Sequence, residues 1–320
     1  MQPPPPSGPH PSPLSQRLGG GNVHSGSLLS PNPGGGAGGG GRPEPSWREI
    51  LAELGVRPSK TLGQNFLHDQ SIVRRIAETA DIKPGELVVE IGPGLGILTR
   101  ELAQRAGEVI AVEFDRRLAE HLRETARLPN LRVVEGDILK TDLTALTGGR
   151  PYTVVANLPY SIATAAIEHL LDSSHPPERL IVMVQREVAE RIVARPPEMS
   201  VLATAVQFYG VPKVAFRIGP GAFIPAPKVE SAVLRIDLHP QLPLTGADRA
   251  HFFELVRVGF GQRRKRLANA LAAGLRQPKP AVEQRLTEAG IALDRRAETL
   301  SVDEWLVVEQ AFVGREHAGH

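Results

Sequence analysis

The sequence predicts an α/β fold, in which a Rossmann-like, mostly parallel sheet is followed by a small all-α C-terminal domain. From residue 46 to about 239, apolar runs with strand character alternate with helical patterns, and the connections are short. Such alternation is typical of right-handed βαβ units, whose parallel sheet is covered on both faces. After residue 239 the strand patterns stop and only helical patterns follow.

The α/β region is expected to begin with a helix at 46–55, with Ser46 as its N-cap and Gly55 as its stop signal. A polar, Gly-containing loop at 60–69 then leads to a helix at 70–82. Five strand patterns alternate with helical patterns, and these strands lie near 86–91, 108–115, 131–139, 152–157 and 179–185. Two late strands within 214–238 surround a Pro/Gly-rich loop, so we expect them as an antiparallel pair at one edge of the sheet.

The predicted domains are a disordered tail (1–45), a catalytic domain (46–239) and a helical domain (240–320). The tail is rich in Pro and Gly and has almost no large apolar side chains, so burial cannot offset its ordering entropy. The boundary of the helical domain is expected near 240–246. Its helical patterns lie at 249–260, 265–275, 280–290 and 301–312.

The composition excludes several classes of function. The chain of 320 residues has no Cys, which rules out disulfides, Cys-ligated zinc and thiol nucleophiles. Its His residues show no metal-ligand spacing, so no metal site is predicted. There is no apolar run of roughly 20 residues and no secretory signal, and we expect a cytoplasmic monomer without membrane contact. The formal net charge is only +2, so a nucleic-acid partner must be inferred from local patches.

A Gly-rich turn stands where the strand near 86–91 ends. The segment EIGPGLG opens a helix and carries Gly92, Gly94 and Gly96. Glycine lets the chain turn sharply and lets a ligand approach the backbone closely. The spacing differs from the G-x-G-x-x-G of dinucleotide binders, and no P-loop motif occurs. By itself such a turn can be only a tight connection.

Acidic residues stand at the ends of the next two strands. Glu113 ends AVEFD, where a carboxylate can accept hydrogen bonds from ribose hydroxyls, and Asp137 in EGDIL can meet an adenine edge. Ligands of open α/β sheets bind outside these carboxyl ends. The three strand ends together predict a ligand that contains adenosine and need not contain a pyrophosphate. S-adenosyl-L-methionine fits this description best.

The next strand end carries NLPY, which we predict to be the reacting segment. If the substrate is an adenine amino group, the Asn157 side-chain oxygen and the Leu158 carbonyl can accept hydrogen bonds from its two N–H groups. These acceptors would stabilise the charge that builds on nitrogen. Pro159 stiffens the turn, and Tyr160 offers a face on which a base can stack. The alternative interpretation is an Asn-initiated turn with a core Tyr.

A second candidate wall is the segment GAFIPAPKVESAV. Phe223 precedes two prolines in a loop that cannot join a central strand, and we predict that it closes on the other face of a flipped base. Taken alone, the residue is better explained as a Phe that caps the core.

The helical region contains a basic run. Seven Lys or Arg residues lie between 257 and 279 without an intervening acid. We predict RNA contacts for the sharpest cluster in this run, which consists of Arg263, Arg264, Lys265 and Arg266. A solvated charged face is the alternative interpretation.

Together, eight ordered motifs resemble the small-subunit ribosomal RNA adenine dimethyltransferase family (KsgA type) over roughly residue 59 to the C-terminus. The motifs are LGQNFL, EIGPGLG, VEFDRRL, GDIL, NLPYSIAT, MVQREVAER, FIPAPKVESAV and FGQRRKRLANAL. The resemblance implies a class I S-adenosylmethionine-dependent methyltransferase sheet. It implies dimethylation of two adjacent adenosines in the 3′-terminal hairpin loop of small-subunit (16S) rRNA, and a role in the maturation of that ribosomal subunit.

The resemblance also implies cofactor contacts by Asn65, Leu67 and Gly92, ribose binding by Glu113 and adenine binding by Asp137. It places Asn157 at the junction of cofactor and substrate. One departure is NLPYSIAT in place of the usual NLPYNIST, which affects the hydrogen bonding of the helix start, although Ser161 can itself cap a helix.

Three other functions stay open. A relative that acts on large-subunit rRNA, or the mitochondrial transcription-factor branch, shares these motifs. An assembly factor whose RNA binding matters more than its catalysis belongs to another class of protein. A dehydrogenase is the remote alternative, because both the Gly spacing and NLPY speak against it.

Overall fold

The computed structural model describes residues 47–56 and 65–313, all of which fall in one compact unit. The predicted disordered tail and the predicted N-cap Ser46 lie outside the described residues. The predicted domain boundary near residue 240 stays a prediction. Within the two described ranges, no helix is both long and apolar enough to cross a bilayer.

A seven-stranded sheet forms the centre of the molecule, in the order β4-β3-β2-β5-β6-β9-β7. Five strands are parallel: β2 (Leu87–Ile91), β3 (Glu108–Glu113), β4 (Leu131–Glu135), β5 (Tyr152–Asn157) and β6 (Arg179–Gln185). The last two strands, β7 (Gly210–Ile218) and β9 (Ser231–Leu238), form an antiparallel pair, and β9 is also antiparallel to β6. The predicted fold class and the predicted antiparallel edge are both confirmed.

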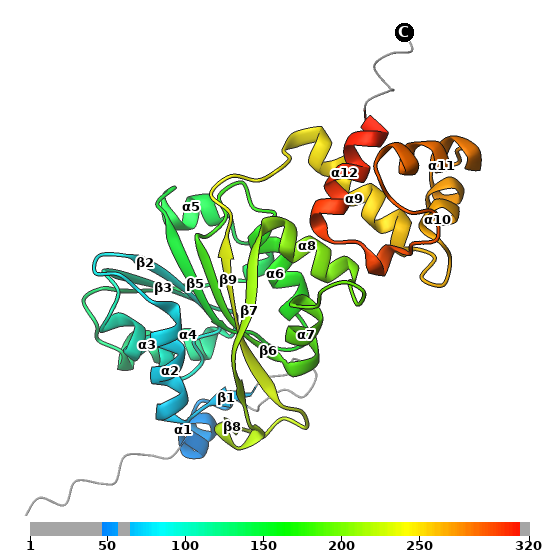
Figure 1. Ribbon diagram of the computed structural model, residues 1–320. Coiled ribbons are helices and arrows are strands. Elements are labelled where there is room, and N and C mark those ends of the chain that lie inside the picture. Colours follow the sequence, from blue (N-terminus) through cyan, green and yellow to red (C-terminus); the bar gives the residue numbers. More distant parts are fainter. Residues whose placement is uncertain (1–46, 57–64, 314–320) are drawn as a thin grey trace, which may run out of the picture. The chain divides into compact units, whose positions relative to one another are not determined.

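Helices cover both faces of this sheet (Figure 1). One face carries α2 (Gln70–Ala80), α3 (Ile97–Ala103) and α4 (Arg116–Thr125). The other face carries α5 (Leu143–Thr147), α6 (Ala163–Leu171), α7 (Arg186–Ile192) and α8 (Val201–Tyr209). Successive residues of β3 serve opposite layers, because Val109 packs with α2 and α3 while Ile110 packs in the layer of α6. Each fully buried aliphatic side chain contributes roughly 1.5–3 kcal/mol.

The four predicted C-terminal helices are confirmed as α9 (Gly246–Phe260), α10 (Leu267–Gly274), α11 (Lys279–Glu288) and α12 (Val302–Val313), and the 3-10 turn η3 (Ala297–Thr299) precedes the last one. Trp305 of α12 is fully buried, and a Cβ at Gly259 would lie 2.5 Å from its ring, so α9 needs glycine there. These helices contact the sheet layer through α8, because the rings of Phe208 and Phe252 are 4.8 Å apart.

Some elements differ from expectation because they are short and depend on distant partners. The loop expected at 60–69 contains β1 (Phe66–Leu67), which pairs with β8 (Phe223–Ile224) in a separate two-stranded sheet. The third strand ends at Glu135, and the 3-10 turn η1 (Ile138–Lys140) replaces its expected end. Another such turn, η2 (Pro220–Ala222), precedes β8. Two-residue strands leave no detectable period in the sequence.

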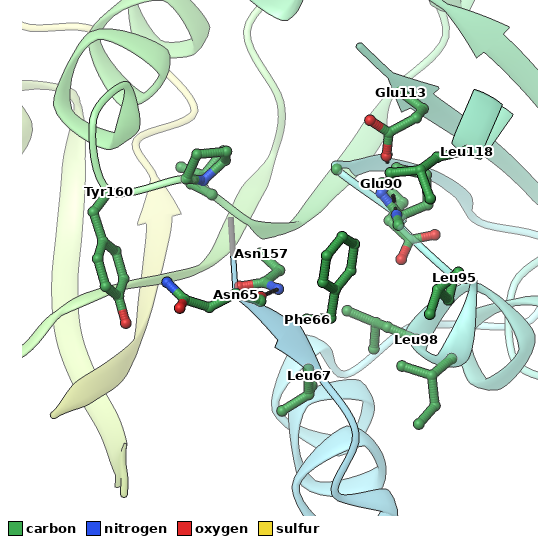
Figure 2. Close-up of a pocket in the computed structure, with 16 residues that line it drawn as sticks. Asn65, Phe66, Leu67, Glu90, Leu95, Leu98, Glu113, Leu118, Asn157 and Tyr160 are labelled. Atoms are coloured by element: carbon green, nitrogen blue, oxygen red, sulfur yellow. Dashed lines mark hydrogen bonds between the residues drawn. The ribbon is translucent and has the colours of Figure 1, made fainter. Parts of the chain in front are cut away.

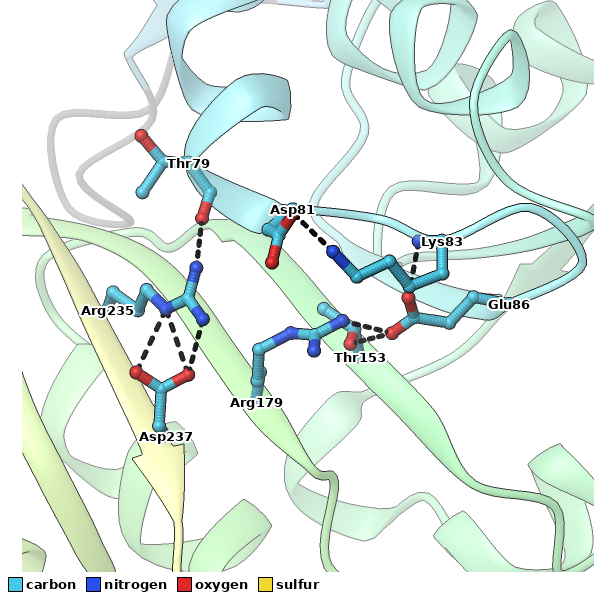
Figure 3. A network of polar contacts seen from close by, with 8 residues as sticks. All are labelled: Thr79, Asp81, Lys83, Glu86, Thr153, Arg179, Arg235 and Asp237. Carbon is cyan, nitrogen blue, oxygen red and sulfur yellow. Dashed lines mark hydrogen bonds and ion pairs between the residues drawn. The ribbon is translucent and has the colours of Figure 1, made fainter. Parts of the chain in front are cut away.

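A polar network ties together the amino ends of the strands, at the edge of the sheet opposite the carboxyl ends (Figure 3). Arg179 of β6 donates to Glu86, which also accepts from the hydroxyl of Thr153 on β5. On β9, Arg235 is 2.7 Å from Asp237 and donates to the Thr79 carbonyl of α2. These groups hold the connection before β2 against β5 and β6, and the end of α2 against β9.

Candidate active site

The carboxyl ends of β2, β3 and β5 open onto one pocket (Figure 2). Nine of the predicted site residues line it: Asn65, Leu67, Gly92, Gly94, Glu113, Asn157, Leu158, Pro159 and Tyr160. Segments up to 95 residues apart in the sequence, from Asn65 to Tyr160, therefore meet at one place.

The Gly-rich turn after β2 needs glycine at two of its pocket positions. Gly92 has a φ of 69°, and a Cβ there would lie 3.2 Å from the carbonyl oxygen of Asn157. Gly94 has a φ of 56°, and a Cβ there would lie 3.0 Å from the ring of Phe66. Side chains at these positions would force apart the turn, the end of β5 and β1.

Gly96, the third predicted glycine, is not in the pocket lining. It is the N-cap of α3 with a φ of 78°, and a Cβ there would collide with Leu122 of α4. Its glycine is explained by helix packing, and a direct cofactor contact by Gly96 stays a prediction.

Glu113 is held by backbone donors on both carboxylate oxygens. Its Oε2 accepts from the N–H of Gly94 at 3.0 Å, and its Oε1 accepts from the N–H of Asp115 at 2.9 Å. Burial raises the pKa of Glu113, while the N–H groups of Asp115 and Gly94 oppose the rise. The carboxylate therefore has a fixed position beside the Gly-rich turn.

Glu90 is a pocket residue that the sequence did not single out. It is 1% exposed, and its Oε2 has no hydrogen-bond partner among the described residues. Burial raises the pKa of Glu90 to about 8, the nearby Thr99 hydroxyl opposes the rise, and the carboxylate of Glu113 adds to it. The signal was present in the sequence, because a Glu in the buried run LVVEI is out of place unless it has a partner.

The amide of Asn157 is oriented by the loop that contains Asn65. Its Nδ2 donates to the carbonyl oxygen of Asn65 at 3.1 Å. The donor end of the amide is thereby used within the protein, and Oδ1 is the end that remains for a ligand. Figure 2 shows the two Asn side chains beside Phe66, between Tyr160 and the acidic pair.

Tyr160 is anchored at its hydroxyl, which lies 2.6 Å from Oγ of Ser231 at the start of β9. Burial raises the pKa of Tyr160, and the hydrogen bond to Ser231 opposes the rise. The anchor holds the ring at the pocket wall. Ser161 can cap a helix but is not the N-cap of α6, because that helix begins after Ile162, which has no side-chain cap hydrogen bond.

Besides Gly96, two predicted residues are not in the pocket lining. The side chain of Phe223 is 3% exposed and packs in the core with α2, because the β1–β8 pairing turns it inward. Asp137 caps η1 by accepting from the N–H of Leu139 at 3.1 Å, and it pairs with Lys140 at 3.7 Å. Base stacking by Phe223 and adenine binding by Asp137 stay predictions.

Two aromatic residues near the site were missed. Phe66 of β1 lines the pocket and lies against the Gly-rich turn. Phe114 directly follows Glu113 and is 66% exposed, more than any other exposed large hydrophobic residue in the described ranges. A large aromatic placed beside a strand-end acid was the signal for Phe114.

The predicted RNA-binding cluster forms the exposed turn between α9 and α10. None of Arg263, Arg264, Lys265 and Arg266 makes an ion pair with a carboxylate of the described residues. Four unpaired cations in one turn form a positive surface that can bind phosphates. Whether RNA contacts them stays a prediction.

A mostly parallel seven-stranded sheet with a Gly-rich turn, an anchored acid and a reactive turn at neighbouring strand ends is the arrangement of a class I methyltransferase. The sequence model of the family "Ribosomal RNA adenine dimethylase" matches residues 56–313. The chain therefore belongs to the ribosomal RNA adenine dimethylase family and is an enzyme, which confirms the resemblance inferred from the motifs.

Curated relatives and solved structures agree with this assignment. Two relatives are named "Ribosomal RNA small subunit methyltransferase A". The relative from Dehalococcoides mccartyi is 45% identical, and the match covers 81% of this chain and 89% of the relative. The relative from Moorella thermoacetica is 43% identical, and the match covers 82% of this chain and 95% of the relative. The 23S rRNA methyltransferase ErmE has 31% identity and a TM-score of 0.65, and the match covers 77% of this chain and 99% of that one. A dimethyladenosine transferase from Plasmodium falciparum, at 24% identity and a TM-score of 0.67, supports the fold. The match covers 76% of this chain and 95% of that one.

Proposed function

We propose that the protein transfers methyl groups from S-adenosyl-L-methionine to N6 of two adjacent adenosines in the 3′-terminal hairpin loop of small-subunit rRNA. Each adenosine receives two methyl groups. The observation that carries the proposal is the pocket in which Glu113 and the Gly-rich turn meet the NLPY turn. The names of the curated relatives favour the small subunit over the large one.

The pocket fits the proposed cofactor. The glycines at 92 and 94 leave room that a Cβ would fill, and the fixed carboxylate of Glu113 is suited to ribose hydroxyls. The unpartnered Oε2 of Glu90 calls for a donor, and the ammonium group of the methionine part would satisfy it. When bound, S-adenosylmethionine supplies a methyl group on a sulfonium sulfur, and this sulfur is a good leaving group.

Phe114 and Asp137 complete the proposed adenosine subsite. The exposed ring of Phe114 stands beside Glu113 and offers a flat face to the adenine of the cofactor. Asp137 follows the end of the neighbouring strand β4, and the N–H of Gly136 donates to the carbonyl of Glu113 at 2.9 Å, which ties the two strand ends together.

The NLPY turn positions the amino group of the target adenosine. Because Nδ2 of Asn157 is held by Asn65, its Oδ1 and the Leu158 carbonyl accept hydrogen bonds from the two N–H groups of the substrate amine. These acceptors stabilise the positive charge on N6 during attack, and the excess proton leaves to water afterwards. Tyr160 provides the stacking face, worth about 1–3 kcal/mol per base.

The exposed cations at 263–266 are proposed to bind phosphates of the hairpin. With this surface the protein acts on immature small ribosomal subunits in the cytoplasm, as a monomer. Phe223 is proposed to meet the flipped base after the 225–230 loop rearranges around the RNA, since its ring is otherwise buried.

The decisive experiment is to map methylated adenines on rRNA from cells with and without the gene. Loss of dimethylation at the two adenosines of the small-subunit hairpin is expected. Loss at a large-subunit adenosine instead would assign the protein to the large ribosomal subunit. If both rRNAs keep their methylation while small-subunit assembly fails, RNA binding rather than catalysis is the function.

A further inference from the structure

The helix α1 (Trp47–Glu53) precedes residue 56, where the match to the family model begins. It is amphipathic: three apolar residues with helical spacing face inward, as does Leu54 directly after the helix, while the residues between them are exposed. The inward residues are Trp47, Ile50, Leu51 and Leu54. Gly55 ends the helix with a φ of 63°, as predicted.

The inward face of α1 packs against the wall of the pocket. Leu51 is 4% exposed and belongs to one hydrophobic cluster with Val56, Leu95 and Leu118. Leu95 and Leu118 also line the pocket, as does Phe66, which packs against the same cluster. The cluster thus has α1 on its outer side and the pocket on its inner side.

A polar connection follows the same route. Arg117 donates from Nη1 to the carbonyl oxygen of Gly55 at 2.7 Å and is 2.9 Å from the carboxylate of Asp115. The N–H of Asp115 in turn donates to Glu113 at 2.9 Å. The end of α1 is therefore linked through two residues to the acid proposed to hold the ribose.

We propose that α1 is the outer wall of the cofactor pocket and that Leu51 is a positioning residue which determines cofactor affinity. This inference rests on the proposed function, because it names the same pocket as the cofactor site. A helix of seven residues has little stability of its own, so α1 forms only while its apolar face is packed. Docking of α1 orders Leu95, Leu118 and Phe66, and by reciprocity a bound cofactor stabilises the docked helix.

The test compares full-length variants. Leu51→Ala is expected to raise the dissociation constant of S-adenosylhomocysteine, measured by calorimetry, and the KM for S-adenosylmethionine by at least about fivefold. The kcat and the KM for RNA should change by less than about twofold, since α1 touches neither the reacting atoms nor the basic turn. Glu53→Ala, on the exposed face of the same helix, should bind as the unmodified protein does, and Leu51→Met should restore affinity.

A second measurement needs no substitution. In the unmodified protein, S-adenosylhomocysteine should slow the hydrogen exchange of the amides at 47–53. Unchanged exchange, or equal affinity of Leu51→Ala and the unmodified protein, would overturn the role of α1 and leave the proposed function standing. If the unmodified protein binds no S-adenosylhomocysteine, the cofactor assignment fails and the role of α1 fails with it. Equal loss of kcat and affinity in Leu51→Ala, without rescue by Leu51→Met, would indicate a purely structural role and also overturn the inference.

Discussion

Nδ2 of Asn157 donates to the backbone carbonyl of Asn65 across 3.1 Å, although the two residues are 92 positions apart in the sequence. This hydrogen bond joins the last residue of β5 to the residue before β1. It also orients the amide, since one N–H of Nδ2 is used within the protein and the acceptor Oδ1 is left for a substrate. The chemistry proposed for NLPY depends on that orientation.

Replacing Asn157 by Ala should abolish methyl transfer while cofactor affinity stays within about tenfold, because the amide acts mainly in the transition state. Single-turnover rates and calorimetry measure the two quantities. Asn130→Ala is the matched control: the Asn130 amide also donates to backbone carbonyls, those of Ala103 and Ala106, but it lies outside the pocket. Near-normal turnover of Asn157→Ala would refute the mechanism.

Tyr160→Phe should keep most of the activity, because the ring that stacks on the base remains. Only the 2.6 Å hydrogen bond between the hydroxyls of Tyr160 and Ser231 is removed, and Ser231→Ala should have a similar, small effect. Tyr160→Ala should lower kcat/KM for RNA by roughly 10- to 100-fold, as expected when stacking of about 1–3 kcal/mol is removed. Steady-state kinetics distinguish the variants, and equal losses for Phe and Ala would show that the hydroxyl, not the ring, matters.

The buried Glu90 should make the stability of the ligand-free protein depend on pH. Its pKa is raised from 4.5 to about 8 on folding, so its stabilising contribution is complete below about pH 4.5 and is lost as the pH rises through 8. Glu90→Gln avoids this loss. As the pH rises from about 5 to 8, the variant should therefore become more stable relative to the unmodified protein. The difference between their free energies of unfolding should grow by up to about 1.4 kcal/mol per pH unit. Urea titrations at several pH values measure the difference, and parallel curves would contradict the prediction.

The same carboxyl should make cofactor binding pH-dependent. Glu90 must lose its proton to form an ion pair with the ammonium group, so the affinity for S-adenosylhomocysteine should weaken as the pH falls below about 8. Glu90→Gln should bind more weakly at about pH 8 and show a flatter pH profile. Calorimetry from about pH 6 to 8 checks both statements. Glu113 is the other titratable group that faces the Glu90 carboxyl. Identical profiles for the two proteins would exclude a direct role for Glu90.

Neutralising Arg263, Arg264 and Lys265 to Gln should weaken RNA binding and flatten its dependence on salt, by about one unit of slope for each phosphate that the variant no longer neutralises. Fluorescence titrations of a hairpin at several salt concentrations provide the slope. The control is neutralisation of Lys83 and Arg116, which are exposed but already paired with Asp81 and Glu120. An unchanged slope in the triple variant would place the RNA surface elsewhere.

Deleting residues 1–45 should leave the melting temperature and the turnover of the protein unchanged, because the composition of that segment offers no core to bury. Thermal unfolding and methyl-transfer assays of the shortened chain check this. A clear loss of either would show that the segment is ordered or contributes to catalysis.

Local patterns were sufficient for the sheet and for much of the pocket. The alternation of strands and helices, the Gly-rich turn and the strand-end residues Glu113 and Asn157 follow from apolar runs and from the rule that parallel strands end at one edge. Those signals are short-range, and each survives in a single sequence. Phe223 and Asp137 show the limit of this reasoning, because a motif indicates which residues belong near a site but not where their side chains point.

The sequence by itself determined the class of fold, the family, the positions of the strand ends and the basic turn at 263–266, because composition, period and motif order encode these properties locally. Only the tertiary structure decided which atoms meet. It paired Asn157 with Asn65 and Tyr160 with Ser231, buried Phe223, and left Oε2 of Glu90 unpartnered in the pocket among the described residues. The physical reason is that hydrogen bonding and burial between residues tens of positions apart depend on how the layers pack, and no local pattern records that packing.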